Sequence, residues 1–342
     1  MAAYTTIDNP ELYFQTVIYI GGQSGGGMKT QAVTFDGEED MSPNMVWIKS
    51  RSNAYTHVLA DSVRGVDEVL RPDKDYAALD GVADSSGGVS IFGSNGFTAA
   101  GNDVAWVAES PSTYVAWCWK ESATAGFDIV AYTGNGTDDT DISHNLSAIP
   151  KMIIVKNRDA ADAWQIYHAG NTSAPETDYM VLDTTAATAD AADRWSDEAP
   201  TSSVFTLGDA DEVNTDTENY IAYCFAEKQG FSKFGSYVGN GSTNGSTIWT
   251  GMRISFLMVK ATSATSAWYI YDNKRAGYNP DNNQLYPDRN NAEDTTDQVD
   301  FLSNGFKWRT TGDPNSSGRT YIYAAFGEAP LVNSNGVPCN AR

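Results

Sequence analysis

One short sequence pattern occurs three times along this chain, at intervals of about 100 residues. It reads Tyr-Val-Ala-Trp-Cys-Trp at 114–119, Tyr-Ile-Ala-Tyr-Cys-Phe at 220–225 and Tyr-Ile-Tyr-Ala-Ala-Phe at 321–326. The interval matches the length of a small domain and is too long for a solenoid repeat. Because repeated domains usually serve placement, assembly or multivalent contact, the pattern favours a structural or binding role over a single catalytic centre.

Other features recur in the same order within each copy. An aromatic strand runs into a glycine turn at Gly21, Gly134 and Gly239, and an apolar stretch further on ends in a lysine. Eight residues after each lysine, a ring-bearing residue opens a new stretch. We therefore infer an internal repeat. Its anchor residues are Trp47, Lys49, His57, Trp117, Lys156, Trp164, Tyr220, Lys260, Trp268 and Tyr321.

The residue pattern indicates an all-β chain. Helical periodicity is nearly absent, and short runs rich in β-branched and aromatic residues alternate with Gly, Asn, Asp, Ser and Pro. This pattern predicts three tandem β-sandwich or jelly-roll-like modules of about 100 residues each. The last strand of each repeat is apolar on both faces, so we expect its partner sheet or a neighbouring module to cover it. In the middle repeat the predicted strands are 127–133, 142–146, 151–156, 163–168, 178–183, 203–207 and 220–227.

The repeat divides the chain into five segments. We expect an N-terminal attachment segment at 1–13, β-sandwich repeats at 14–122, 123–228 and 229–330, and a C-terminal tail at 331–342. The links between repeats are very short, so the repeats should pack against each other rather than swing freely. Both terminal segments are candidates for attachment to another protein.

One loop in each repeat differs most between the copies. These loops cover 67–88, 184–199 and 279–298, and all three are polar. Long divergent loops on a constant scaffold often determine what a protein contacts. The alternative is that each is a tolerated surface insertion.

The charge balance excludes some classes of partner. Lys and Arg number 22 against 44 Asp and Glu, which gives a formal net charge of -22. Such a surface repels phosphate backbones and anionic lipid, so we expect neither nucleic-acid binding nor membrane docking. The chain also lacks an apolar run of about 20 residues, so we expect no membrane insertion.

Cysteine usage gives no indication of a disulfide or a metal centre. Cys118 and Cys224 hold the same position in successive repeats, so we expect two buried free thiols. Cys339 is expected to be an incidental thiol near the C-terminus. No spacing resembles a zinc site, and we expect no cofactor.

No catalytic constellation is evident. His57 stands where the other repeats have Trp, which indicates a flat ring packed against the core rather than a catalytic base. There is no Gly-x-Ser-x-Gly elbow and no His-x-x-x-His pair. Acidic turns at 138–141, 190–193 and 209–212 offer oxygen ligands for calcium, although none has the spacing of a known calcium loop.

The three repeated lysines allow two interpretations. Lys49, Lys156 and Lys260 each follow an apolar strand and lie near acidic turns. The favoured interpretation is a charge at the strand end whose ammonium reaches solvent. The alternative is an ion pair between modules that fixes their packing.

The chain resembles an uncharacterised family of tailed-bacteriophage proteins that is abundant in marine phages. The likeness covers nearly the whole chain, and the third repeat is its most divergent part. The matching segments are Ala-Tyr-Thr-Thr-Ile-Asp at 3–8, Tyr-Phe-Gln-Thr at 13–16, Asp-Ser-Val-Arg-Gly at 61–65, the strand at 114–120, His-Asn-Leu at 144–146, Pro-Lys-Met-Ile-Ile-Val-Lys at 150–156 and Asn-Ala-Arg at 340–342.

The resemblance implies a non-enzymatic virion protein, most often a tail fibre or tail-tip appendage that contributes to host attachment. It implies other virion proteins as partners and assembly with copies of itself, for which we expect a trimer. Alternatively, three unequal modules on one chain could imitate a trimer. The N-terminus lacks the features of a secretion signal, so we expect synthesis in the host cytoplasm and release by lysis.

Aromatic side chains in the third repeat suggest a contact with a host surface glycan, and the alternative is that they pack in the core of a β-sandwich. Exposed rings can stack on sugar faces while Asn and Asp bind hydroxyl groups. Two alternative functions remain: a capsid decoration or head-fibre protein, and a polysaccharide depolymerase, which would need two carboxylates in a groove. The candidate glycan residues are Tyr269, Tyr271, Tyr278, Tyr286 and Trp308.

Overall fold

The computed structural model describes residues 4–339 apart from 26, 82, 84–86 and 297. This part of the chain is almost entirely antiparallel β-structure, so the all-β prediction is confirmed. No helix in it is long and apolar enough to cross a membrane. The helical elements are single turns: η1 (Pro10–Leu12), η2 (Pro175–Thr177), α1 (Ala192–Trp195) and α2 (Asp211–Asn214).

Each repeat contributes one main sheet with the same strand order. The first strand of the repeat pairs with its last strand, which pairs with an internal hairpin. The first main sheet contains β1 (Phe14–Ile20), β9 (Thr113–Trp119), β3 (Met45–Ser50) and β4 (Val58–Asp61). The second contains β10 (Phe127–Thr133), β17 (Asn219–Ala226), β12 (Pro150–Asn157), β13 (Gln165–His168), β14 (Asp178–Val181) and β15 (Ala189–Asp190). The third contains β18 (Ser232–Val238), β24 (Thr320–Pro330), β20 (Met252–Ala261) and β21 (Trp268–Asp272).

A smaller sheet accompanies each main sheet. Two of these sheets have three strands, while the one in the second repeat has two. The smaller strands are β2 (Lys29–Thr34), β8 (Gly96–Gly101) and β7 (Gly88–Gly93); β11 (Thr140–Ser143) and β16 (Val204–Leu207); and β19 (Thr247–Trp249), β23 (Gly305–Trp308) and β22 (Val299–Leu302). A further short pair, β5 (Glu68–Val69) and β6 (Leu79–Asp80), belongs to the first repeat.

All seven strands predicted for the middle repeat are present, with ends shifted by a few residues. The prediction omitted β15 and the turns α1 and α2, because elements this short leave no periodic pattern.

The repeated glycine turn follows from close packing at the end of each first strand. An added Cβ atom on Gly21, Gly134 or Gly239 would lie 2.2, 2.1 or 2.3 Å from a backbone oxygen of the loop before the last strand. Only a residue without a side chain fits there. The glycine thus lets the turn pack against that loop in all three repeats.

Alternation along each last strand divides its side chains between two cores. In β9, Tyr114, Ala116 and Cys118 point into a core enclosed within the first repeat. Trp117 and Trp119 point the other way, as the period of two in a strand requires. Cys118 and Cys224 are both buried and free, as predicted, and burial raises the pKa of each thiol well above its usual value.

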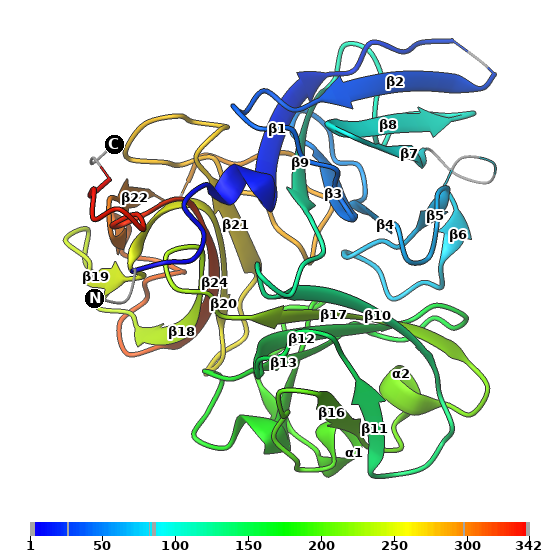
Figure 1. Cartoon of the computed structure of the whole chain (residues 1–342), viewed down its shortest axis with the longest axis vertical. Coiled ribbons are helices and arrows are strands. Elements are labelled where there is room, and N and C mark those ends of the chain that lie inside the picture. The colour runs from blue at the N-terminus through cyan, green and yellow to red at the C-terminus, as the bar shows by residue number, and fades with distance from the viewer. Residues whose placement is uncertain (1–3, 26, 82, 84–86, 297, 340–342) are drawn as a thin grey trace.

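The outward faces of the three main sheets meet in one shared core. Figure 1 shows the repeats arranged around a common centre, and the buried cluster there draws residues from all three. At its middle lie Trp119, Phe225 and Phe326, the last aromatic residue of each repeated pattern. Their ring centroids are 6.4, 5.5 and 5.8 Å apart in pairs. The last strands are therefore covered on both sides, by their own smaller sheet and by the neighbouring repeats.

Both ends of the described chain lie beside the third repeat (Figure 1). The Tyr4 hydroxyl donates to the carbonyl of Gly251 at 2.8 Å, and Thr5 donates to the carbonyl of Gln229 at 2.8 Å. Ile7 is 3% exposed and belongs to the shared core. The N-terminal segment thus joins the first repeat to the third. Residues 1–3 and 340–342 of the two expected attachment segments lie outside the described residues.

Truncating a ring at the centre should weaken the whole molecule. We predict that Phe326→Ala lowers the free energy of unfolding by about 3–5 kcal/mol, because it removes a buried ring and leaves a cavity. Urea titration followed by tryptophan fluorescence measures this loss. The control is Ile91→Ala on the exposed surface of β7, for which we expect a change within about 0.5 kcal/mol. Equal unfolding midpoints for the two variants would contradict the assignment of a shared core.

Candidate functional site at the seams between repeats

Each of the three divergent loops, 67–88, 184–199 and 279–298, contacts the next repeat, so none of them is only a surface insertion. Their role in contacts with other molecules stays a prediction. In each case a loop backbone N–H donates to the carbonyl two residues after the repeated lysine. The bonds run from Ala78 to Arg158 at 2.8 Å, from Thr188 to Thr262 at 3.0 Å and from Glu293 to Arg51 at 2.8 Å.

The repeated ring residues also bind the repeat whose loop reaches them. His57 contacts the loop of the third repeat, Trp164 contacts that of the first, and Trp268 contacts the end of β14 in the second. The three contacts form a closed cycle. The distances are 2.9 Å from His57 Nε2 to the Tyr286 carbonyl, 3.0 Å from Trp164 Nε1 to the Lys74 carbonyl and 2.9 Å from Trp268 Nε1 to the Val181 carbonyl.

The environment of His57 defines its protonation. Its Nδ1 accepts a hydrogen bond from the indole of Trp47 at 2.9 Å, so Nε2 carries the proton that is donated to the Tyr286 carbonyl. Burial lowers the pKa of His57 to about 4. The ring is therefore neutral near pH 7, and both of its nitrogens are occupied by contacts within the protein.

An aspartate, buried in the first and third repeats and half-buried in the second, fixes the backbone at each of these ring residues. The N–H groups of His57, Trp164 and Trp268 each donate to a carboxylate from the neighbouring loop of the same repeat. The acceptors are Asp73 at 2.9 Å, Asp183 at 2.9 Å and Asp288 at 3.0 Å. Sequence reasoning missed this set, although the three aspartates follow the repeat interval.

A second buried polar position lies at the end of the fourth strand in each main sheet. Asp61 accepts from Arg64 Nε at 2.5 Å and from the hydroxyl of Tyr223, in the second repeat, at 2.7 Å. Asp272 accepts from Arg275 Nε at 2.5 Å and from the Trp117 indole, in the first repeat, at 2.9 Å. The Asp-x-x-Arg spacing at 61–64 and 272–275 was the available sequence signal.

In the second repeat a histidine occupies the equivalent position. Met152 pairs with His168 just as Met45 pairs with Asp61. His168 Nε2 lies 3.1 Å from the carbonyl of Tyr323, in the third repeat, and burial lowers the pKa of this ring to about 4. The contacts at this strand-end position therefore also form a cycle, from the first repeat to the second, from the second to the third and from the third to the first.

The expectation that the repeated lysines reach solvent is wrong. Lys49, Lys156 and Lys260 are fully buried, and burial lowers their pKa values to about 7, 8 and 8. Each ammonium instead donates to backbone carbonyls, because a buried donor needs acceptors. The distances are 2.7 Å from Lys49 Nζ to Ser50, 2.7 Å from Lys156 Nζ to Asn157, and 2.5 and 3.0 Å from Lys260 Nζ to Ser266 and Thr185. Of the three, Lys260 bridges two repeats, through a carbonyl rather than an ion pair.

The third repeat does not present the expected aromatic platform. Tyr271 and Trp308 are fully buried and Tyr269 and Tyr286 are 8% exposed, all within the core of that repeat. Their rings pack on one another and on Phe306 rather than facing solvent. Tyr278 alone among the five candidates is exposed, at 76%.

Three equivalent carboxylates lie at the seams, the boundaries where one repeat meets the next. The partner of this carboxylate differs from seam to seam. Glu121 hydrogen-bonds with Asp128, and burial together with this neighbour raises the pKa of Glu121 to about 7. Glu227 forms an ion pair with Lys233 at 2.7 Å. Glu328 turns back within its own repeat to Arg253, at 2.6 Å, and to Asn273.

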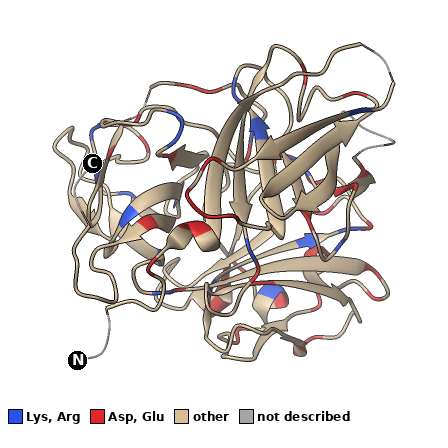
Figure 2. Ribbon diagram, turned by 45° about the horizontal axis from the view of Figure 1, so that its top comes forward, with Lys and Arg blue, Asp and Glu red and all other residues tan. Residues whose placement is uncertain are grey.

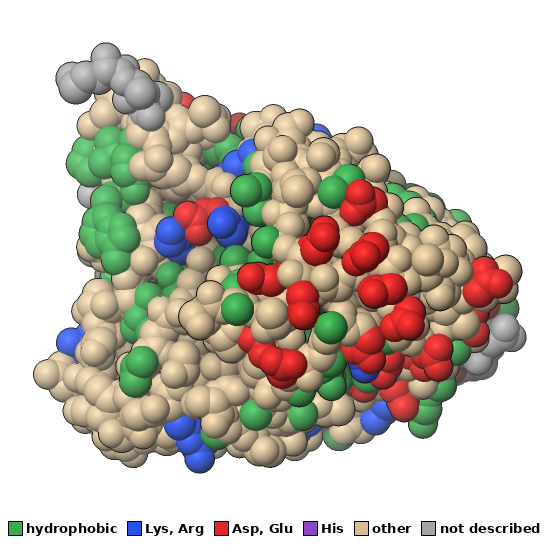
Figure 3. All heavy atoms as spheres, turned by 90° about the horizontal axis from the view of Figure 1, so that it is seen from below, with side chains coloured by type: hydrophobic (Ala, Val, Ile, Leu, Met, Phe, Trp, Pro, Cys, Tyr) green, Lys and Arg blue, Asp and Glu red, His purple; other side chains and the backbone are tan. Residues whose placement is uncertain are grey.

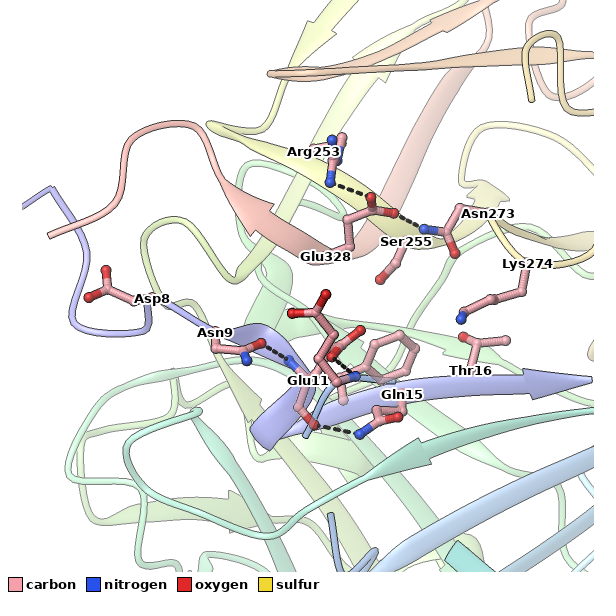
Figure 4. Close-up of a pocket in the computed structure, with 12 residues that line it drawn as sticks. Asp8, Asn9, Glu11, Gln15, Thr16, Arg253, Ser255, Asn273, Lys274 and Glu328 are labelled. Carbon is pink, nitrogen blue, oxygen red and sulfur yellow. Dashed lines mark hydrogen bonds and ion pairs between the residues drawn. The ribbon is translucent and has the colours of Figure 1, made fainter. Parts of the chain in front are cut away.

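The seam between the third repeat and the first contains an open groove. A groove of about 530 Å³ lies between the N-terminal segment with β1 on one side and β20, β21 and β24 on the other. Figure 4 shows the two walls facing each other, with Glu11, Gln15 and Thr16 on one and Ser255 and Lys274 on the other.

Acidic residues are spread along the loops and strand ends (Figure 2) and gather on the face that Figure 3 shows. Asp193, Asp209 and Asp211 are exposed around an open hollow of about 410 Å³ in the second repeat. Arg194 lines it too and pairs with Asp193 at 2.7 Å. Within the described ranges, no group of three or more His, Cys, Asp or Glu is placed to hold a metal ion.

These features define an all-β protein whose three repeats close into a ring around one core. A family model described as a domain of unknown function (DUF7483) matches residues 9–330, and the chain belongs to this family. The single match runs through all three repeats. No curated protein and no solved structure is significantly similar to the chain.

Removing one hydrogen bond between repeats should cost measurable stability. We predict that Tyr223→Phe lowers the free energy of unfolding by about 1.5–3 kcal/mol, because it takes a donor from the buried Asp61 carboxylate. Chemical denaturation measures the change. Tyr278→Phe, the same exchange at an exposed position, is the control and should be neutral. A neutral Tyr223→Phe would show that this contact does not hold the seam together.

The Glu121 seam should weaken as pH rises. Its carboxyl binds a proton more tightly in the folded state than in the unfolded state, where its pKa is near 4.5, so stability falls between about pH 4.5 and pH 7. We predict that Glu121→Gln raises the denaturation midpoint at pH 8 and has little effect at pH 4.5. Glu227→Gln removes an ion pair and should not stabilise the protein at pH 8. The same pH response in both variants would refute the assignment.

Proposed function

We propose that this protein is a structural component of a tailed-bacteriophage particle, a tail fibre or tail-tip appendage that contributes to host attachment. The observation that supports this role best is the closed ring of three repeats. A rigid block with threefold-like symmetry suits a position on a symmetric particle, where equivalent contacts recur around an axis.

The way the ring is held together supports rigidity. Loops, ring residues and buried polar side chains of each repeat contact the neighbouring repeat, and the outward faces of the main sheets share one core. Inter-repeat motion would break buried hydrogen bonds and expose apolar surface, both of which are costly. An appendage that transmits contact with a host surface needs such stiffness.

The use of the polar side chains favours a non-catalytic role. His57 and His168 are buried, and both ring nitrogens of each face donors or acceptors of the protein itself. His144 contacts the carbonyl of Thr201 and the N–H of Leu146. No histidine is thus left as a ready general base for hydrolysis.

The ring also bears on assembly. One chain already combines three related units, which favours the interpretation that a single copy imitates a trimer. Size-exclusion chromatography with light scattering distinguishes this from a true homotrimer: the imitation predicts the monomer mass of 36.9 kDa, whereas a homotrimer has three times that mass.

Locating the chain in particles of the phage that encodes it tests the proposal. We expect cryo-electron microscopy and gold-labelled antibodies to place it at the tail, in a copy number that matches the symmetry of the tail. Copies spread over the shell would instead indicate a head decoration or head-fibre protein. Absence from purified particles would refute a virion role, and release of reducing ends from host polysaccharide would indicate a depolymerase.

A further inference from the structure

We propose that the groove between the first and third repeats binds a neutral, hydroxyl-rich ligand, of the size of a mono- or disaccharide. Its volume of about 530 Å³ falls within the range of small-molecule sites. The walls are mostly polar, so the ligand must supply hydrogen bonds rather than apolar surface.

The groove does not follow from the repeated architecture, because the other two seams are closed at the equivalent place. At the equivalent place, Glu121 meets Asp128 and Glu227 meets Lys233 directly, so those seams are closed by a contact between side chains. At the third seam Glu328 turns to its own repeat, and Gln15 donates to the backbone carbonyls of Glu11 and Glu39 on its own side of the seam. The equivalent strands therefore enclose a space at this seam.

The wall residue Thr16 supplies an independent observation. Thr16 pairs with Trp117 across the first two strands of its main sheet. The equivalent pairs in the other two repeats are Ile129 with Tyr223 and Phe234 with Ala324. The other two seams thus hold an apolar side chain where this seam holds a hydroxyl. Thr16 is 4% exposed, and its Oγ1 has no hydrogen-bond partner within the described chain. A buried hydroxyl without a partner is costly, and a ligand hydroxyl in the groove would satisfy it.

The charges of the lining select against ionic ligands. Asp8, Glu11 and Glu38 stand on the side of the N-terminal segment and first repeat, and Arg253, Lys274 and Glu328 on the side of the third. An anion would meet the carboxylates and a cation would meet the guanidinium and ammonium groups. A sugar hydroxyl both donates and accepts, so it can bind to either wall without a charge penalty.

Lys274 points from the third repeat toward the wall that carries Thr16 (Figure 4). Its ammonium is 3.0 Å from Asp36 and can turn one of its three N–H bonds toward a ligand oxygen. Donors and acceptors thus approach the groove from both sides. This binding site goes beyond the proposed structural role and does not depend on it.

Saturation-transfer NMR on the full chain tests the inference. The probes are neutral hexoses, N-acetylhexosamines and their disaccharides, with glucuronate and glucosamine as charged alternatives. We expect transfer to at least one neutral sugar and to none of the charged probes. Thr16→Val should weaken that binding about tenfold by removing the unpartnered hydroxyl, and should raise the melting temperature, since valine has nearly the same shape.

Thr247→Val on β19 is the matched control, because this exposed threonine lies outside the groove and should leave sugar binding unchanged. Lys274→Met is a second variant that should also weaken binding. The proposal is overturned if no neutral sugar binds, if binding survives Thr16→Val and Lys274→Met, or if only a charged probe binds. None of these results would decide the structural role, which is tested separately by locating the chain in the phage particle.

Discussion

The architecture depends on apolar contact between the outward faces of the three main sheets. A small sheet with one open apolar face is not stable in water, and each main sheet covers that face by packing against the other two. Trp119, Phe225 and Phe326 meet at the middle of this contact. Since each sheet needs both neighbours, the repeats share one core and are not independent domains in a row.

The polar groups at the rim of this core give the packing its order. Each repeat extends a loop to the next, and buried carboxylates, indoles and imidazoles pair across each seam in the same rotational sense. Burying such groups is tolerable only when they are satisfied, so their pairing specifies one arrangement of the repeats. Lys49 and Lys156 contribute within their own repeats, by donating to backbone carbonyls at and just after the ends of their strands. Lys260 also donates to the Thr185 carbonyl of the second repeat.

The local elements of this fold were predictable, whereas their long-range partners were not. Alternating apolar runs predicted the strands of the middle repeat, and the two-sided last strand indicated cover on both faces. Lys49 was misinterpreted because lysine is usually exposed, and nothing in its local sequence indicates the carbonyls that receive it. Aromatic composition likewise cannot distinguish a buried Trp308 from an exposed Tyr278. The groove at Thr16 could not be predicted, because it depends on how the first repeat meets the third.

Differential scanning calorimetry of the intact chain tests most directly whether the three repeats are one cooperative unit. A shared core predicts a single transition whose calorimetric enthalpy equals its van't Hoff enthalpy. Two or three resolvable transitions, or a calorimetric enthalpy two to three times the van't Hoff value, would show that the repeats unfold independently and would contradict the central role of their common core.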